Sequence, residues 1–255
     1  MLESNESAES AESTDGAAFG LLVPATNQVM ERDFMRWLPA GARLYVNRLN
    51  APKVRPRDML DNLLAITSGV GEAARLLDLA EPGVIGFGCT SGSFLNGAGW
   101  DDEIRDRVAG SSRCGKIVVT ARAAADALRA LGARRIAVAT PYPEMVNALL
   151  RTYLEHFGFE ICAFHAVDGW GSGGISRLAP QIAIDLALQG MTARPDAIFI
   201  SCTNFRAGEV IDRIEAEAGV RVVTANQATF WACARQLGMT RALPGLGHLG
   251  QRGAH

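Results

Sequence analysis

The chain has 255 residues, of which 48% are hydrophobic and 20% are charged, and its formal net charge is −2. No apolar run approaches the roughly 20 residues that a helix needs to span a bilayer, so we expect no association with a membrane. Because the charges nearly balance, nothing in the composition favours binding to nucleic acid or to an anionic membrane surface.

The N-terminus is acidic and of low complexity. The opening stretch "MLESNESAESAESTDG" contains five acids and no lysine or arginine, the reverse of a signal peptide. Its repeated Ser, Glu and Ala offer nothing to bury, so the pattern predicts a disordered acidic tail over residues 1–18. The five cysteines form no CxxC pair, which indicates reduced thiols in a cytoplasmic protein. The four histidines show no metal-ligand spacing, and we expect no metal.

After this tail, short apolar runs alternate with helical patterns. Such alternation is typical of repeated strand–helix units and a parallel sheet. The predicted strands are "FGLLVP", "RLYVNRL", "GVIGFGC", "KIVVTA", "RRIAVAT", "FEICAFHAV", "DAIFISC" and "RVVTAN". The predicted helices lie at residues 58–80, 123–132, 143–158, 180–191, 207–219 and 228–238.

The strands fall into two sets of four whose surroundings match. Pro24 and Asn27 follow the first strand as Tyr142 follows the fifth, and "VVTARAAADALRALG" parallels "VVTANQATFWACARQLG". This internal repeat predicts an α/β fold of two similar lobes, related by a pseudo-twofold axis. The expected divisions are an N-terminal lobe at 19–115, completed by the C-terminal helix within 221–245, and a C-terminal lobe at 116–220.

Two strands end in nearly the same phrase, "GVIGFGCTSGSF" and "DAIFISCTNFRAG". Ligands of open parallel sheets bind beyond the carboxyl ends of the strands, and the pseudo-twofold axis would bring Cys89 and Cys202 face to face there. A cysteine that precedes a helix meets unpaired N–H groups and the positive dipole end, which lowers the thiol pKa. We therefore expect these two thiols to react with alkylating reagents before the others. The donors that follow them suit a carboxylate or its enolate: Thr90, Ser91, Thr203 and Asn204.

Other features receive a different interpretation. A lone cysteine at a strand end is more often a small core residue, and Cys114, Cys162 and Cys233 lack the repeated setting. The stretch "GWGSGG" matches G-x-G-x-x-G but has no ribose-binding acid on a following strand, so it predicts a pocket loop rather than a dinucleotide site. Tyr142 lies just beyond a strand end, where its hydroxyl would point into the cleft.

Four motifs together resemble a known family. "LLVPATNQVME", "GFGCTSGSFLNG", "TPYPEMVN" and "SCTNFRAGEVIDRIE…VVTANQATFW" are similar to motifs of the aspartate/glutamate racemase superfamily. Within it they resemble the branch of maleate cis-trans isomerase, arylmalonate decarboxylase and the related ectoine-utilisation proteins, over nearly the whole chain after residue 18. The resemblance implies two Rossmann-like lobes with the active site between them. It also implies chemistry without a cofactor or metal and, often, a homo-oligomer.

The resemblance assigns roles to individual residues. It implies that Cys89 and Cys202 are the paired acid/base or nucleophilic residues, and that Asn27 contacts a substrate carboxylate. Arylmalonate decarboxylase has a glycine at the position of Cys89, whereas maleate isomerase has both cysteines. Maleate isomerase has an asparagine where this chain has Ser172, and this departure argues against maleate itself as the substrate. The resemblance also implies further substrate-binding residues. They are Pro24 at the strand end, Thr90, Ser91, Tyr142, Thr203 and Asn204.

Two sulfurs favour chemistry at two faces or two atoms of one substrate. The sequence therefore predicts a cofactor-independent isomerase or racemase of a small carboxylate or dicarboxylate, acting through a covalent or enediolate intermediate. The alternative is a decarboxylase that uses only Cys202 as proton donor. A two-lobed ligand-binding protein without turnover is a third hypothesis, although such a protein has no need for paired sulfurs.

Overall fold

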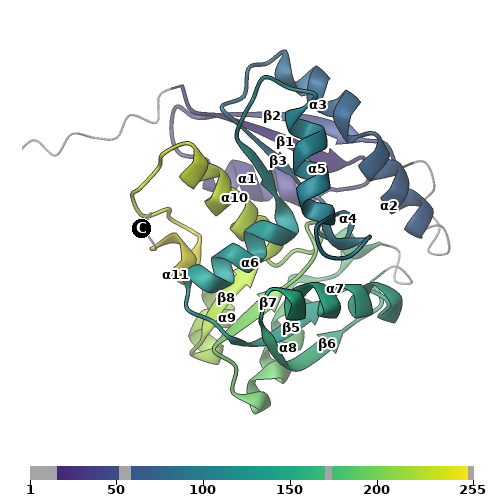
Figure 1. The fold of residues 1–255 in the computed structure, drawn as a ribbon. Helices are drawn as coiled ribbons and strands as arrows, with labels where there is room; N and C mark the ends of the chain where they lie inside the picture. The colour runs from purple at the N-terminus through teal and green to yellow at the C-terminus, as the bar shows by residue number, and fades with distance from the viewer. Residues whose placement is uncertain (1–15, 52–58, 170–173, 252–255) are drawn as a thin grey trace, which may run out of the picture.

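The computed structural model describes residues 16–51, 59–169 and 174–251, so most of the predicted acidic tail lies outside the described residues. The described chain forms two lobes, each built on a four-stranded parallel sheet (Figure 1). The order is β2-β1-β3-β4 in the first sheet and β6-β5-β7-β8 in the second, which confirms the predicted α/β fold with matching halves. The strands are β1 Ala18–Pro24, β2 Arg43–Leu49, β3 Val84–Phe87, β4 Ile117–Val119, β5 Arg135–Thr140, β6 Glu160–Ala166, β7 Ala197–Ile200 and β8 Arg221–Thr224.

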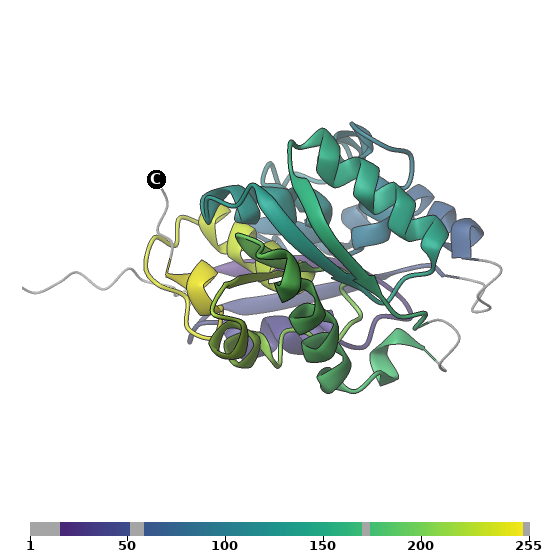
Figure 2. The same ribbon diagram turned by 90° about the horizontal axis from the view of Figure 1, so that it is seen from below.

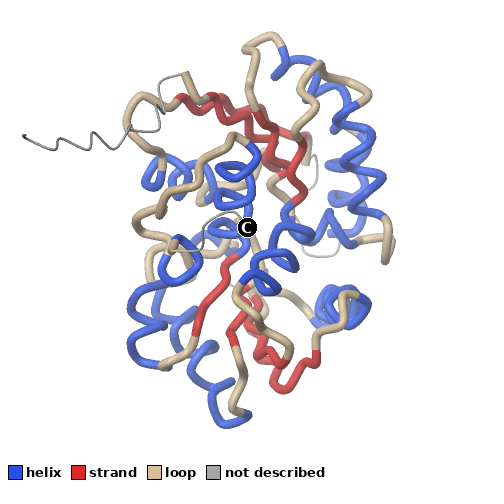
Figure 3. The backbone as a smooth tube through the Cα atoms, turned by 60° about the vertical axis from the view of Figure 1, so that its left-hand side comes forward, coloured by secondary structure: helices blue, strands red, loops and turns tan. Residues whose placement is uncertain are grey.

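Each predicted strand forms because its sequence suits its place in a sheet. The central strands β1, β3 and β7 are continuous apolar runs, and every residue in them is buried. The edge strands β2 and β6 mix charged and apolar residues, and most of their side chains are only partly buried. Figure 3 shows the two sheets as separate groups of strands surrounded by helices.

Helices cover both sheets, and some of them were not predicted from the sequence. In the second lobe, α7 lies on one side of the sheet and α8 on the other (Figure 2). The predicted helix over 58–80 divides at Gly69 into α2 and α3. The described α-helices are α1 Met30–Trp37, α2 Met59–Ser68, α3 Val70–Asp78, α4 Thr90–Phe94, α5 Trp100–Ala109, α6 Thr120–Ala130, α7 Glu144–His156, α8 Pro180–Gln189, α9 Ile211–Ala218, α10 Ala225–Gln236 and α11 Gly247–Gly250; the short 3-10 helices are η2 Ile175–Arg177 and η3 Gly190–Ala193.

The last strand of each sheet lies just after an expected lobe boundary. β4 pairs with β3 in the first sheet, and β8 pairs with β7 in the second. The pairing therefore places residues 117–119 with the first lobe and residues 221–224 with the second, a few residues beyond the expected divisions at 115 and 220.

Helix α10 returns the C-terminal part of the chain to the first lobe, where it packs against α1, α6 and β3. Phe230 lies at the centre of this contact. Its ring stacks on Phe19 at a centroid distance of 5.2 Å and meets the edge of Phe34 at 5.2 Å. The first lobe is thus completed by a helix from the far end of the chain, which couples its folding to that of the second lobe.

None of the described helices is both long and apolar enough to cross a membrane. Within residues 16–51, 59–169 and 174–251, no three or more His, Cys, Asp or Glu side chains gather so that they could hold a metal ion.

The aromatic contact of α10 gives a stability prediction. Phe230→Ala should lower the free energy of unfolding by about 3–5 kcal/mol, because it opens a cavity where three aromatic rings meet. Phe164→Ala on the edge strand β6, where the ring is only partly buried, should lower it much less. Urea unfolding of both variants measures the difference, and equal losses would contradict the role of α10 in closing the first lobe.

Candidate active site

The carboxyl ends of β3 and β7 open onto one cavity of about 420 Å³ between the lobes. Cys89 follows β3, Cys202 follows β7, and both side chains line this cavity. The structure also brings here nearly every other candidate residue, namely Pro24, Asn27, Thr90, Ser91, Tyr142, Thr203 and Asn204. Ser172 lies outside the described residues.

Cys89 is the residue that precedes the short helix α4. Burial raises the pKa of its thiol to about 11, and hydrogen bonds from the Gly92 N–H and the Ser91 hydroxyl offset only part of that rise. The expectation of a lowered pKa is therefore wrong for the free protein. The N–H groups of this five-residue helix stabilise a thiolate and lower the pKa. The loss of water around the buried thiolate raises the pKa by more.

Cys202 lies in a backbone turn that few non-glycine residues adopt. Its φ is 96°, in the left-handed region, where a Cβ atom is strained. Burial raises the pKa of its thiol to about 12, the Asn204 N–H and the Tyr142 hydroxyl lower it in part, and the nearby Cys89 raises it further. Because each sulfur disfavours the charge of the other, the pair holds at least one proton at neutral pH.

Two hydroxyl groups in the cavity differ in their partners. The Thr90 Oγ1 atom is buried and has no hydrogen-bond partner within the described residues, so it is available to a ligand. Tyr142 is 3% exposed and its hydroxyl lies 3.5 Å from the Ser201 Oγ. Burial first, and then the charge of a Cys202 thiolate, raises the pKa of Tyr142 well above its usual value, so it stays a neutral donor.

The other predicted contacts join the two lobes. Asn27 donates from Nδ2 to the Thr203 Oγ1 at 3.0 Å, while its Oδ1 accepts from the backbone N–H groups of Val29 and Met30 at the start of α1. The Thr203 hydroxyl in turn donates to the Gly88 carbonyl at 3.1 Å. These side chains hold the cavity together, and a direct contact with substrate remains a prediction for them.

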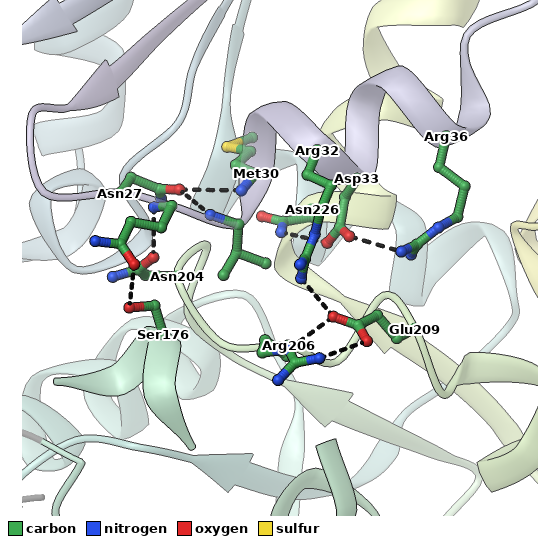
Figure 4. A network of polar contacts seen from close by, with 12 residues as sticks. Asn27, Met30, Arg32, Asp33, Arg36, Ser176, Asn204, Arg206, Glu209 and Asn226 are labelled. Atoms are coloured by element: carbon green, nitrogen blue, oxygen red, sulfur yellow. Dashed lines mark hydrogen bonds and ion pairs between the residues drawn. The ribbon is translucent and has the colours of Figure 1, made fainter. Parts of the chain in front are cut away.

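A second interlobe contact lies next to the first. Asn204 accepts from the Gln28 N–H at 2.9 Å, and the Ser176 hydroxyl donates to the Gln28 side-chain oxygen at 3.1 Å (Figure 4). Neither Gln28 nor Ser176 was predicted from the sequence, because their partners lie 148 to 176 positions away.

The cavity also has an apolar wall that was not predicted. It is made by Leu63 and Ile66 of α2 and by Ile175 of the second lobe. Arg177 is the one Lys, Arg, Asp or Glu among the described lining residues, and it is exposed at the surface. The helical pattern of α2 signalled a buried face, but nothing in it showed that this face would meet a ligand.

The chain is similar to known proteins over most of its length. The family model described as arylmalonate decarboxylase matches residues 19–250. The maleate isomerase of Pseudomonas putida is 25% identical over 242 residues, which cover 90% of this chain and 95% of that protein. The arylmalonate decarboxylase of Bordetella bronchiseptica is 29% identical over 240 residues, with the same two coverages of 90% and 95%. Among solved structures, the maleate isomerase of Pseudomonas putida S16 matches with a TM-score of 0.80 and 26% identity, covering 91% of this chain and 97% of its own.

The strained turn gives a prediction in which two matched sites should respond oppositely. At Cys202, with φ of 96°, the glycine variant should be more stable than the alanine variant by about 1 kcal/mol, because glycine has no Cβ. At Cys89, with φ of −140°, the order should reverse, since glycine in ordinary extended backbone loses more entropy. Urea unfolding of the four variants tests this, and the same order at both positions would rule out strain at Cys202.

The raised pKa values predict the order of thiol alkylation in the free protein. Cys162 is the only one of the five cysteines that is not buried, and it should react with iodoacetamide first. Cys89 and Cys202 should follow slowly, because both are buried and neutral, and the fully buried Cys233 should be last. Peptide mass spectrometry over time gives the order. If Cys89 or Cys202 is labelled fastest, that thiol is activated as the sequence predicted, and its pKa is not raised.

Proposed function

The chain belongs to the arylmalonate decarboxylase family, and we propose that it is a cofactor-independent isomerase or racemase of a small carboxylate or dicarboxylate. The observation that carries the proposal is that Cys89 and Cys202, from opposite lobes, line the same cavity. A relative named as a maleate isomerase, similar over nearly the whole length of both chains, supports the same class of reaction.

The surroundings of the sulfurs suggest a division of work. Burial raises the pKa of both thiols, so each carries its proton before substrate binds and can act as a proton donor. We assign Cys202 as the acid, the same role that it has in the decarboxylase alternative, and Cys89 as the base or nucleophile. A thiolate with a high pKa is scarce at neutral pH but strongly basic and nucleophilic, as attack on carbon next to a carboxylate requires.

Two reaction courses fit this arrangement. In an isomerase, the Cys89 thiolate adds to one carbon of the double bond, and the displaced electron pair moves into the adjoining carboxylate as an enediolate. Cys202 gives its proton to the carbon next to that carboxylate, the resulting single bond rotates, the proton returns to Cys202, and the carbon–sulfur bond breaks to release the other isomer. In a racemase, Cys89 removes the proton next to the carboxylate and Cys202 returns its own proton to the opposite face.

The cavity offers groups that would hold the enediolate. Thr90 presents a buried hydroxyl without a partner among the described residues, and Ser91 and Tyr142 line the same space. Hydrogen-bond donors of this kind are most effective in a site that excludes water, because they need no reorganisation as the charge develops.

A decarboxylase is the second candidate, and the apolar wall favours it. Leu63, Ile66 and Ile175 would surround a carboxylate without hydrogen bonds, and desolvation of that carboxylate promotes loss of carbon dioxide. Cys202 would then protonate the enediolate, and Cys89 would not be needed. The similarity to a protein named as an arylmalonate decarboxylase supports this alternative.

The setting of the protein is also a proposal. All five cysteines are free, which is consistent with a reducing compartment, and we place the protein in the cytoplasm. We expect its only partner to be a small-molecule carboxylate substrate, and not nucleic acid or a membrane. Assembly into a homo-oligomer is a further prediction.

The two candidates are separated by serine and glycine variants. Wild-type protein should be screened by proton NMR in deuterated water with maleate, aspartate, hydantoin-like and arylmalonate compounds. On the reactive compound, Cys89→Ser and Cys202→Ser should each lose about 10²–10⁴-fold in rate, because one proton or bond is handled at each sulfur. Cys162→Ser, outside the cavity, is the control and should retain activity. Full activity in Cys89→Ser or Cys89→Gly, with loss only in Cys202→Ser, would replace the isomerase with the decarboxylase.

A further inference from the structure

A buried carboxyl group lies behind the Cys202 turn. Asp33, on α1 of the first lobe, is completely buried and does not line the cavity. Its Oδ2 accepts a hydrogen bond from the Asn226 Nδ2 at 2.8 Å, and its Oδ1 accepts from Arg36 at 3.2 Å (Figure 4). A completely buried carboxylate is unusual unless specific partners hold it there.

The amide nitrogen that reaches Asp33 also reaches the turn. The Asn226 Nδ2 donates to the Thr203 carbonyl at 3.1 Å, directly after Cys202 in the chain. The same loop packs on the carboxylate from another side, since a Cβ at Gly208 would lie only 2.5 Å from the Asp33 Oδ2. Asp33, Asn226 and Thr203 therefore form one continuous chain of contacts from α1 to the strained residue.

The Asn226 side chain depends on Asp33 for its orientation. Its Oδ1 is buried without a hydrogen-bond partner among the described residues, so the amide is held only through its nitrogen. One of the two acceptors of that nitrogen is Asp33 and the other is the Thr203 carbonyl. Without the carboxylate, the amide loses the contact that points it at the turn.

The turn needs such support because its backbone is strained. A non-glycine residue at φ of 96° persists only where its surroundings hold it. Thr203 is held by the Gly88 carbonyl and Asn27 through its side chain and by Asn226 through its carbonyl. The last of these bonds restrains the backbone itself, together with the Phe205 N–H, which donates to the Cys202 carbonyl at 3.3 Å within the turn.

We propose that Asp33 is a positioning residue that acts through Asn226 on the Thr203 carbonyl and so keeps the Cys202 turn in its strained form, with the sulfur buried in the cavity. The consequence for turnover rests on the proposed function, whereas the effect on the turn does not.

The charged neighbours of Asp33 do not explain its burial by themselves. Arg36 is 42% exposed, and the Arg32–Glu209 and Arg206–Glu209 ion pairs lie in contact with solvent, where such pairs contribute little. Burial raises the pKa of Asp33 to about 6, so at pH 8 the carboxylate is ionised and accepts the Asn226 bond.

The test measures alkylation of Cys202 by iodoacetamide at pH 8, with Cys89 and Cys233 in the same molecule as internal controls. Asp33→Ala should speed labelling of Cys202 by about tenfold or more, because a released turn exposes the thiol and each unit fall in its pKa raises the thiolate fraction tenfold. Labelling of Cys89 and Cys233 should not change. Asp33→Asn, which keeps an acceptor for the Asn226 nitrogen, should restore nearly the wild-type rate.

Two further variants complete the test. Asn226→Ala cuts the same link from the other side, so it should speed Cys202 labelling alone, and adding Asp33→Ala to it should have no further effect. Asp101→Ala removes a carboxylate that is also buried but bonds to Arg122 and Tyr153, and it should leave the Cys202 rate unchanged. If Asp33→Ala does not fold, the Asn226→Ala result decides.

Unchanged Cys202 labelling in a folded Asp33→Ala variant, unchanged labelling in Asn226→Ala, or equal acceleration of all three cysteines would each overturn the proposal. If Cys202 in Asp33→Asn is labelled as fast as in Asp33→Ala, the proposal is also overturned. In that case Asp33 matters for its charge, through the ion pair with Arg36, and not as the acceptor for Asn226. Alkylation needs no substrate, so this outcome is independent of whether the protein proves to be an isomerase.

Discussion

The hydrogen bond from the Thr203 hydroxyl to the Gly88 carbonyl, at 3.1 Å, is the contact on which the site depends. It joins the residue after Cys202 to the residue before Cys89, and so it connects the carboxyl ends of β7 and β3 directly. Two lobes that folded separately would leave the distance between the sulfurs undefined. With this bond, and the Asn27 amide on the same hydroxyl, the two cysteines are held at one cavity.

Burial sets the chemistry that this geometry permits. Both thiols are neutral in the free protein because a charged sulfur would lose its water, and each would repel a charge on the other. Two protonated thiols at one cavity can donate a proton to a substrate and accept one back from it. In the proposed reaction, the neutral Tyr142 and the Thr90 hydroxyl, which has no partner among the described residues, would donate hydrogen bonds where negative charge develops.

The sequence was informative wherever a feature depends on local pattern. The strands were predictable because continuous apolar runs end in turns, and the Cys89 and Cys202 positions were predictable because the pattern repeats. Helices α1 and α5 were missed, although "MERDFMRW" buries residues at positions 30, 33, 34 and 37, a helical spacing within a charged stretch. The pKa direction was wrong because a helix start is visible in sequence, whereas burial on all sides is not. The separate roles of Thr90 and Thr203 could not be predicted either, since the partners of Thr203 lie 115 and 176 residues away.

The central claim is that one substrate reacts between two sulfurs from opposite lobes, and a crystal structure with the reactive carboxylate bound tests it most directly. We predict a carboxylate on the Thr90 hydroxyl and reacting carbon atoms within about 3–3.5 Å of both Cys89 and Cys202. A ligand that contacts Cys202 alone, with the Cys89 sulfur turned into the core of the first lobe, would contradict it.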